Sequence, residues 1–179
     1  MSKRPLITAE NIHKYLHYDP ETGAFHWINQ NTKRIGRRLD YTCKDGYVII
    51  DINGYVYSAH RLAWLYVHGY LPENWIDHIN RNPSDNRIAN LREASPQCNA
   101  RNTGNPKNNT SGVKGVNQNE SGSWTASIKV SGKSIYLGTF RNFREAVAMR
   151  YEAEKKHGWE SCDPNSPAKQ YLKKCGLLE

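Results

Sequence analysis

The sequence predicts an α+β protein made of two small domains, and three observations support this fold class. Two alternating, β-rich runs meet at Asn53-Gly54, a dipeptide typical of a two-residue hairpin turn. Short strand-like segments within residues 112–140 are followed by an amphipathic helical pattern over residues 143–158. Between the two halves, residues 103–112 contain no large apolar side chain, which is typical of a linker.

The order of the elements follows from this division. We expect a first domain over 1–102, a linker over 103–111, a second domain over 112–160 and a C-terminal tail over 161–179 without regular structure. In the first domain the patterns predict a helix over ITAENIHKYLHY capped by Thr8, a strand in AFHWI and a helix in HRLAWLYVHG, with a basic loop at 31–40.

The charge of the chain indicates a polyanionic partner. The 179 residues have a formal net charge of +8, and residues 101–160 hold ten basic and five acidic side chains. The excess lies mainly in the second half, where it predicts a surface for nucleic acid. A basic protein that is merely soluble remains an alternative on charge alone.

Cysteine spacing and hydropathy exclude several classes of protein. The four cysteines, at 43, 98, 162 and 175, form no C-x-x-C pair, so we expect no structural zinc and no disulfide scaffold, only reduced thiols. No apolar run approaches the ~18 residues of a membrane span, and no signal peptide opens the sequence. We therefore expect a cytoplasmic protein with no membrane partner.

The densest polar pattern lies in residues 75–102. Asp77-His78 is followed by Asn90 and then by Asn99, in an order that predicts a strand, a polar loop and a helix starting near Ser95 or Pro96. This layout brings Asp77 and Asn99 toward one cation, with His78 beside it.

These side chains suit phosphodiester hydrolysis. A histidine with a reference pKa of ~6.5 can deprotonate water near neutral pH. Carboxylate and amide oxygens suit Mg²⁺ or Mn²⁺, and such a cation neutralises charge that develops on the phosphate. An isolated Asp-His pair is common, and Asn90 alone is more often a cap or turn residue, so only the combination is informative.

The segment resembles the HNH endonucleases, especially their phage and intron-associated homing branch. The resemblance covers residues 19–102, with GYVII and HRLAW ahead of DHIN, DNR and NLR. It implies a ββα-metal fold that acts on DNA, with His78 as general base, Asn90 holding the histidine loop, and Asp77 and Asn99 as ligands of one Mg²⁺ or Mn²⁺.

Two positions depart from the common pattern of that family. Asn99 stands where many members have His, as in nicking members, and Arg81 stands where many have Gly. Arg81 is therefore a candidate phosphate contact, with a solvated side chain as the alternative. His60 and Arg61 are further DNA-binding candidates, although His60 could equally be a structural histidine.

Residues 112–158 resemble the AP2/ERF DNA-binding domain through GVKGV, WTASI, IYLGTF and EAVAMRYEAEKK. The resemblance implies a three-stranded antiparallel sheet, backed by one helix, that binds double-stranded DNA in the major groove. The matching positions give these groove-side candidates: Lys114, Asn117, Trp124, Ser127, Lys129 and Tyr136. Lys133 is a further DNA-binding candidate on or beside that face. For Trp124 and Tyr136, packing within the sheet is the alternative.

The sequence leaves three hypotheses of different weight. The first is a homing-type endonuclease of phage origin, acting in the host cytoplasm, whose second domain supplies affinity for a specific duplex site. The second is a non-catalytic AP2-type DNA-binding regulator with a degenerate HNH core, which the intact Asp77, His78, Asn90 and Asn99 disfavour. A repair or packaging nuclease is the third.

Overall fold

The computed structural model describes residues 6–28, 41–52, 54–106 and 108–179. It divides into two compact units, Met1–Pro96 and Gln97–Glu179, each with its own core. The predicted basic loop at 31–40 and the turn residue Asn53 lie outside the described residues. Within the described part, no helix has the length and apolar character needed to cross a membrane.

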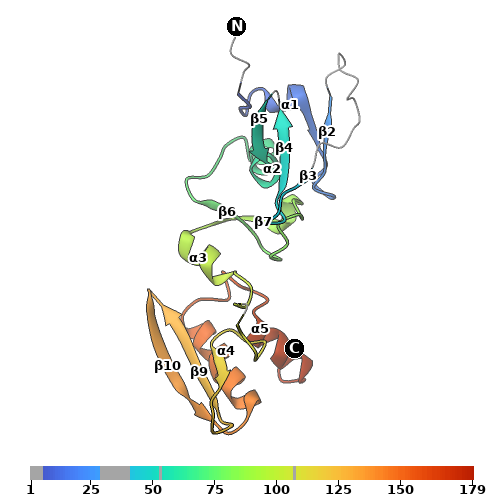
Figure 1. The fold of residues 1–179 in the computed structure, drawn as a ribbon. Coiled ribbons are helices and arrows are strands. Elements are labelled where there is room, and N and C mark those ends of the chain that lie inside the picture. Colours follow the sequence, from blue (N-terminus) through green and yellow to red (C-terminus); the bar gives the residue numbers. More distant parts are fainter. Residues whose placement is uncertain (1–5, 29–40, 53, 107) are drawn as a thin grey trace. The chain divides into compact units, whose positions relative to one another are not determined.

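The first unit combines two short helices with three small antiparallel sheets (Figure 1). The elements, in chain order, are α1 (Ile12–Tyr15), β1 (Leu16–Tyr18), β2 (Phe25–Trp27), β3 (Tyr41–Thr42), β4 (Val48–Ile52), β5 (Tyr55–Ser58), α2 (Ala59–His68), β6 (Trp75–His78), a 3-10 turn (Ile88–Asn90) and β7 (Leu91–Ala94).

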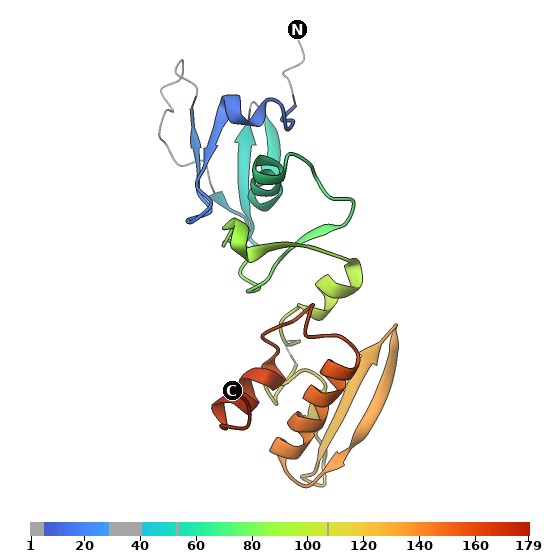
Figure 2. The same cartoon turned by 180° about the vertical axis from the view of Figure 1, so that it is seen from behind.

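The core of this unit lies between α2 and the strands before it. Ile12, Leu16, Phe25, Ile50 and Leu62 are almost fully buried there, and Figure 2 shows α2 beside β4 and β5. The predicted hairpin is confirmed, because β4 pairs with β5 from Ile49↔Ser58 to Ile52↔Tyr55. The strand in AFHWI and the helix in HRLAWLYVHG are also confirmed.

The helix predicted over ITAENIHKYLHY is wrong at both ends, and Thr8 does not cap it, because the helix begins after Asn11. Only Ile12–Tyr15 is helical, and the chain then pairs as β1 with β2, with Leu16 opposite Trp27. Leu16 and Tyr18 are buried on one side of this strand while His17 is exposed. Burial of two large side chains by alternation outweighs the weak helical spacing of the same residues.

The second unit is a three-stranded antiparallel sheet with helices packed against it. Its elements are α3 (Pro96–Arg101, whose first residue ends the first unit), β8 (Val116–Gln118), β9 (Trp124–Val130), β10 (Lys133–Phe140), α4 (Phe143–Lys156) and α5 (Pro167–Lys174). The strand order is β10-β9-β8, and α4 lies along one face of the sheet (Figure 1). Val116, Ala126, Ala146 and Val147 form the core between sheet and helix.

Two expectations for this unit require correction. The tail expected to lack structure contains α5, where Ser166 accepts a hydrogen bond from the Lys169 amide and a proline occupies the first turn. Ala168 and Leu172, four residues apart, then bury against the core. The unit also begins at Gln97, before the expected linker.

The cysteines expected to be reduced include a pair that is bonded. Cys98 on α3 and Cys162 form a disulfide within the second unit, whereas Cys43 and Cys175 are free. The two partners are 64 residues apart. Their sequence spacing gave no indication of the bond, because it is the fold that brings the segments together.

Candidate active site

β6 and β7 position the Asp-His pair at the end of a two-stranded sheet. Asp77 lies opposite Arg92, and His78 lies opposite Leu91. Asp77 and His78 are both buried, at 7 % and 5 % exposure. The predicted strand and the loop after it are confirmed, and α3 begins at Pro96 as expected.

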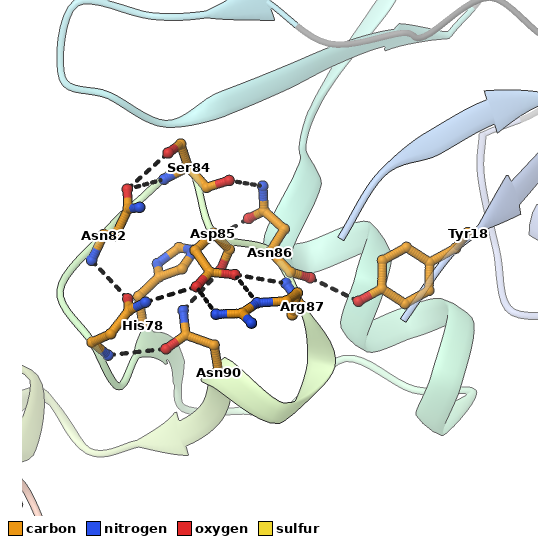
Figure 3. A network of polar contacts seen from close by, with 9 residues as sticks. Tyr18, His78, Asn82, Ser84, Asp85, Asn86, Arg87 and Asn90 are labelled. Carbon is orange, nitrogen blue, oxygen red and sulfur yellow. Dashed lines mark hydrogen bonds and ion pairs between the residues drawn. The ribbon is translucent and has the colours of Figure 1, made fainter. Parts of the chain in front are cut away.

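Asn90 closes the loop that follows His78 (Figure 3). Its side-chain oxygen accepts a hydrogen bond from the Asn80 amide at 3.0 Å, and its side-chain nitrogen donates to the Asp85 carbonyl at 2.8 Å. Its backbone carbonyl accepts from the Ile79 amide at 2.8 Å. Asn90 thus joins the two ends of the loop.

Asp85 stiffens the same loop by an ion pair with Arg87. The Arg87 guanidinium donates to both carboxylate oxygens at 2.8 and 2.6 Å, and the Asn80 side chain donates to one of them at 2.7 Å (Figure 3). These bonds, with Arg87 first, lower the pKa of Asp85 to about 2. The carboxylate is therefore ionised across the physiological range.

Asn86 contacts the ring of His78 directly, although no sequence pattern singled it out as a site residue. His78 Nε2 lies 3.2 Å from Asn86 Oδ1, and Asn86 is only 2 % exposed. The Asn86 side-chain nitrogen points to the Ser84 carbonyl at 3.3 Å, which orients the amide so that its oxygen faces the ring (Figure 3). An oxygen acceptor makes Nε2 the protonated nitrogen of neutral His78, leaving the lone pair of the ring on Nδ1.

The N-terminal strands support this arrangement from behind. The Tyr18 hydroxyl on β1 donates to the Asn86 carbonyl at 2.7 Å (Figure 3). Gly23, in the turn between β1 and β2, has φ +73°, and a Cβ there would lie 2.6 Å from the Arg87 amide nitrogen. Neither residue was predicted to take part in the site, because both are more than 50 residues before it in sequence.

The surroundings of His78 keep its ring neutral. Burial lowers the pKa of His78, while the hydrogen bond to Asn86 and the charge of Asp77 partly oppose this change. The His60 ring lies edge-on at 5.2 Å from His78, and burial, with the neighbouring His78 and Arg61, lowers the pKa of His60 to about 4. Tyr47 packs against both rings.

The predicted DNA contacts of the first unit differ in accessibility. His60 is half-buried, and its Nδ1 finds no hydrogen-bond partner among the described residues, so its ring contacts favour packing. Arg61 is exposed on α2. Arg81 has φ +63°, a left-handed backbone conformation that favours glycine.

Asp77 carries a partner that the sequence did not indicate. Arg92 donates from Nε and Nη2 to one carboxylate oxygen, at 3.0 and 2.8 Å. Asn99 lies half-buried on α3 in the second unit, so its convergence with Asp77 stays a prediction. Among the described residues, no three His, Cys, Asp or Glu side chains gather as a metal site.

The two predicted ligands, each taken by itself, have the chemistry that suits a hard cation. A carboxylate has about four lone-pair positions on its two oxygens, so the Arg92 pair does not by itself prevent coordination. Asp77 and an Asn99 carbonyl are oxygen donors of the kind that Mg²⁺ and Mn²⁺ prefer.

In the second unit, strand register places the groove-side candidates on the sheet. Ser127 lies opposite Tyr136, Lys129 opposite Ser134, and Asn117 opposite Thr125. They alternate with the buried Ala126 and Ile128, which face α4, so they belong to the opposite, outer face.

Two other candidates are not on that face. The Trp124 ring packs 4.6 Å from Phe143 of α4 and belongs to the core cluster, because it has the same phase as Ala126. Lys133 pairs with Val130 and shares the helix-facing phase, although it is exposed at the end of β10. Lys114 precedes β8 and donates to Thr103 Oγ1 at 2.9 Å.

Three kinds of comparison with known proteins each give a match. Residues 57–101 match a family model described as HNH endonuclease. Protein 3.8 of Escherichia phage T7 is 35% identical over 102 residues, which cover 55% of this chain and 84% of that protein. A solved structure of DNA binding and cleavage by the HNH homing endonuclease I-HmuI is 24% identical in sequence, with a TM-score of 0.42. The match covers 54% of this chain and 55% of that protein, so this chain spans about half the length of I-HmuI.

Proposed function

The chain belongs to the HNH endonuclease family, and from this premise we propose that it hydrolyses phosphodiester bonds of double-stranded DNA with His78 as general base. The observation that carries the proposal is the pairing of His78 with Asn86 inside a loop closed by Asn90. Such a loop holds one imidazole in one orientation, as a base that acts on a water molecule requires.

The ring can accept a proton at neutral pH. Because Nε2 is directed at the Asn86 oxygen, Nδ1 is the nitrogen that takes the proton from the attacking water. The lowered pKa of His78 keeps the free base present at pH 7. After the transfer, the nearby Asp77 carboxylate stabilises the imidazolium.

One divalent cation, Mg²⁺ or Mn²⁺, would be held by Asp77 and Asn99. When bound, it neutralises the charge that develops on the scissile phosphate and the leaving oxygen. With a single carboxylate that is already paired with Arg92, we expect weak affinity for the cation in the absence of DNA.

The second unit would supply much of the affinity for a specific duplex site. The three-stranded sheet with α4 packed against it supports this proposal, because a domain of the AP2/ERF type would use such a sheet to bind the major groove. We assign the outer face, with Asn117, Ser127, Lys129 and Tyr136, to the major groove, and leave Trp124 out because it packs on α4. Arg61 and Arg81 are candidate phosphate contacts of the first unit, in a homing-type enzyme of phage origin acting in the host cytoplasm.

A non-catalytic DNA-binding regulator is the second candidate. The Arg92 ion pair favours it, since an arginine that donates two bonds to Asp77 competes with a cation for the same carboxylate. The intact His78, Asn86 and Asn90 network favours the enzyme.

Cleavage of supercoiled DNA with and without Mg²⁺ tests the proposal. We expect nicked or linear product only with the cation, and His78→Ala should lower the rate by ~10²–10⁴, the usual contribution of a general base. His17→Ala, which removes an exposed histidine on β1, serves as the matched control and should cleave normally. Mapping the ends of the product distinguishes a nick from a double-strand cut.

Two outcomes would contradict the proposal. Cleavage by His78→Ala within about tenfold of the wild-type rate would remove His78 as the base. Tight binding of the duplex without any cleavage in Mg²⁺ or Mn²⁺ would favour the regulator.

A further inference from the structure

A cavity of about 240 Å³ in the second unit is lined by three cationic side chains. Arg101 comes from α3, Lys114 from the segment before β8, and Lys129 from β9, and the turn at Ser131-Gly132 closes one side. No Asp or Glu occurs among the described residues that line it. Three positive charges therefore meet at one cavity without a carboxylate in its wall.

Arg101 is the most unusual of the three. Its Nη1 donates only to neutral groups, the Gly158 carbonyl at 3.4 Å and Cys162 Sγ at 3.7 Å, and it makes no ion pair within the described part of the chain. Its guanidinium lies 5.3 Å from the centre of the Trp159 ring, and partial burial lowers its pKa. Partial loss of solvent around a cation without an opposite charge is unfavourable, and a bound anion would offset part of that cost.

The fold holds these charges in place. The Cys98–Cys162 disulfide joins α3 to the segment that follows α4, so Arg101 stays beside Trp159. Lys114 Nζ donates to the Ala100 carbonyl at 3.3 Å and to Thr103 Oγ1 at 2.9 Å. The cavity is thus formed by segments distant in sequence that are bonded to one another.

We propose that this cavity binds one backbone phosphate of DNA, with Arg101 and Lys129 as its principal contacts. This inference rests on the proposed function of the second unit and adds Arg101 to its DNA interface. Phosphate matches the chemistry, because guanidinium and ammonium groups are the usual partners of phosphate oxygens.

A stacked base fits the cavity less well than a phosphate. Trp159 is only 4% exposed, and the guanidinium groups of Arg101 and Arg150 lie 5.3 and 4.5 Å from its ring centre. Little of the ring surface is therefore available for stacking.

The position of Lys129 favours DNA over a free phosphate ion. Lys129 lines the cavity and also belongs to the outer face of the sheet, where it lies opposite Ser134. A DNA strand lying on that face would pass the mouth of the cavity and place a phosphate within reach of Lys129 and Arg101.

Salt dependence of DNA binding by the full chain tests the assignment. Fluorescence anisotropy of a labelled duplex, without divalent cations and over a series of NaCl concentrations, gives the slope of log K against log salt. Arg101→Gln and Lys129→Gln should each flatten the slope by about 0.9 and weaken binding roughly fivefold at about 0.15 M salt, as expected for one phosphate contact. Lys155→Gln is the matched control, since it removes a charge on α4 that is paired with Glu152 at 2.7 Å.

The possible outcomes separate the alternatives. The proposal would be overturned if the salt slopes of Lys129→Gln and Arg101→Gln equalled the slope of the control, Lys155→Gln. Thermal unfolding identifies any variant that fails to fold, and the exposed Lys129 keeps the test valid if Arg101→Gln is unstable. Saturable binding of inorganic phosphate at constant ionic strength, with unchanged DNA slopes, would make the cavity a site for the free ion and overturn the DNA assignment.

Failure of the proposed reaction would look different. If the wild-type chain did not cleave the duplex in Mg²⁺ but bound it with the slopes predicted here, the nuclease proposal would fall and the phosphate site would stand. If the wild-type chain cleaved the duplex but Arg101→Gln and Lys129→Gln left the salt slope unchanged, the phosphate site would fall and the nuclease proposal would stand.

Discussion

Asn86 determines the orientation of His78 through a single hydrogen bond. We expect Asn86→Leu, which keeps the volume but loses the acceptor, to reduce the cleavage rate by ~10–100-fold, the range usual for groups that orient a reacting side chain. Asn86→Asp keeps an oxygen acceptor and should retain more of the activity. Single-turnover rates at saturating DNA measure both variants.

A spectroscopic control distinguishes a change in the orientation of the His78 ring from a general loss of structure in the Asn86 variants. ¹⁵N NMR of the His78 ring should report a proton on Nε2 in the wild-type protein and in Asn86→Asp, and a mixture of tautomers in Asn86→Leu. Equal activity of the two variants, with the same tautomer, would remove the positioning role of Asn86.

His60 makes the stability of the fold sensitive to acid. Its pKa is about 4 in the folded protein, against an ordinary value of 6.5, so the unfolded chain binds more protons between these values. Stability is therefore unaffected above pH ~6.5 and decreases as the pH falls from about 6.5 to about 4, by on the order of 3 kcal/mol at most. The lowered pKa of His78 acts in the same direction.

Melting temperatures between pH 7.5 and 4.5 measure this effect. His60→Gln cannot take up the proton, so its melting temperature should decline less than that of the wild-type protein across this range. Parallel curves for the two proteins would show that other groups cause the acid sensitivity.

At the scale of elements, the β1–β2 hairpin supports the histidine loop through close contact at Gly23. Gly23 and Gly69 both have left-handed backbones, at φ +73° and +75°, but only at Gly23 would a Cβ meet other atoms, at 2.6 Å from the Asn86 carbonyl carbon. Gly69→Ala should cost on the order of 1 kcal/mol from backbone strain alone. Gly23→Ala should cost more, and should also reduce cleavage because it displaces the partner of His78.

Denaturant unfolding and cleavage rates of the two variants check this prediction. The comparison is matched in substitution and backbone conformation, so any difference reports the contact with Asn86. Similar losses of stability and unchanged cleavage in both variants would show that the hairpin does not support the site.

At the scale of the whole molecule, each of the two units has its own core, and the disulfide belongs to the second. Because the Cys98–Cys162 bond closes a loop with a sequence separation of 64, its removal by Cys98→Ser should lower the free energy of unfolding of that unit by about 2–4 kcal/mol. Cys43→Ser, which removes a free thiol from the first unit, should leave the second unit unchanged. Denaturant curves with and without reductant measure the contribution of the disulfide to the free energy of unfolding. A thiol titration should find two free thiols before reduction.

Local sequence signals were sufficient to predict several elements. Asn53-Gly54 and the alternation around it predicted the β4–β5 hairpin, and helical spacing predicted α2. The order Asp77, His78, Asn90 predicted a strand and a loop, which the structure contains, while the role of Asn90 in holding the histidine stays a prediction. These outcomes follow because turn chemistry and hydrophobic periodicity act over a few residues.

The partners of those residues depend on long-range packing that no local pattern shows. Asn86 orients His78, Arg92 pairs with Asp77, and Tyr18 contacts Asn86 across 68 positions of sequence. Leu16–Tyr18 became a strand because β2 offered a partner, and Cys98 met Cys162 because α3 lies beside the segment after α4. Each of these contacts depends on which surfaces the packed cores bring together. They cannot be predicted from a short sequence pattern, because many residues along the whole chain determine that packing.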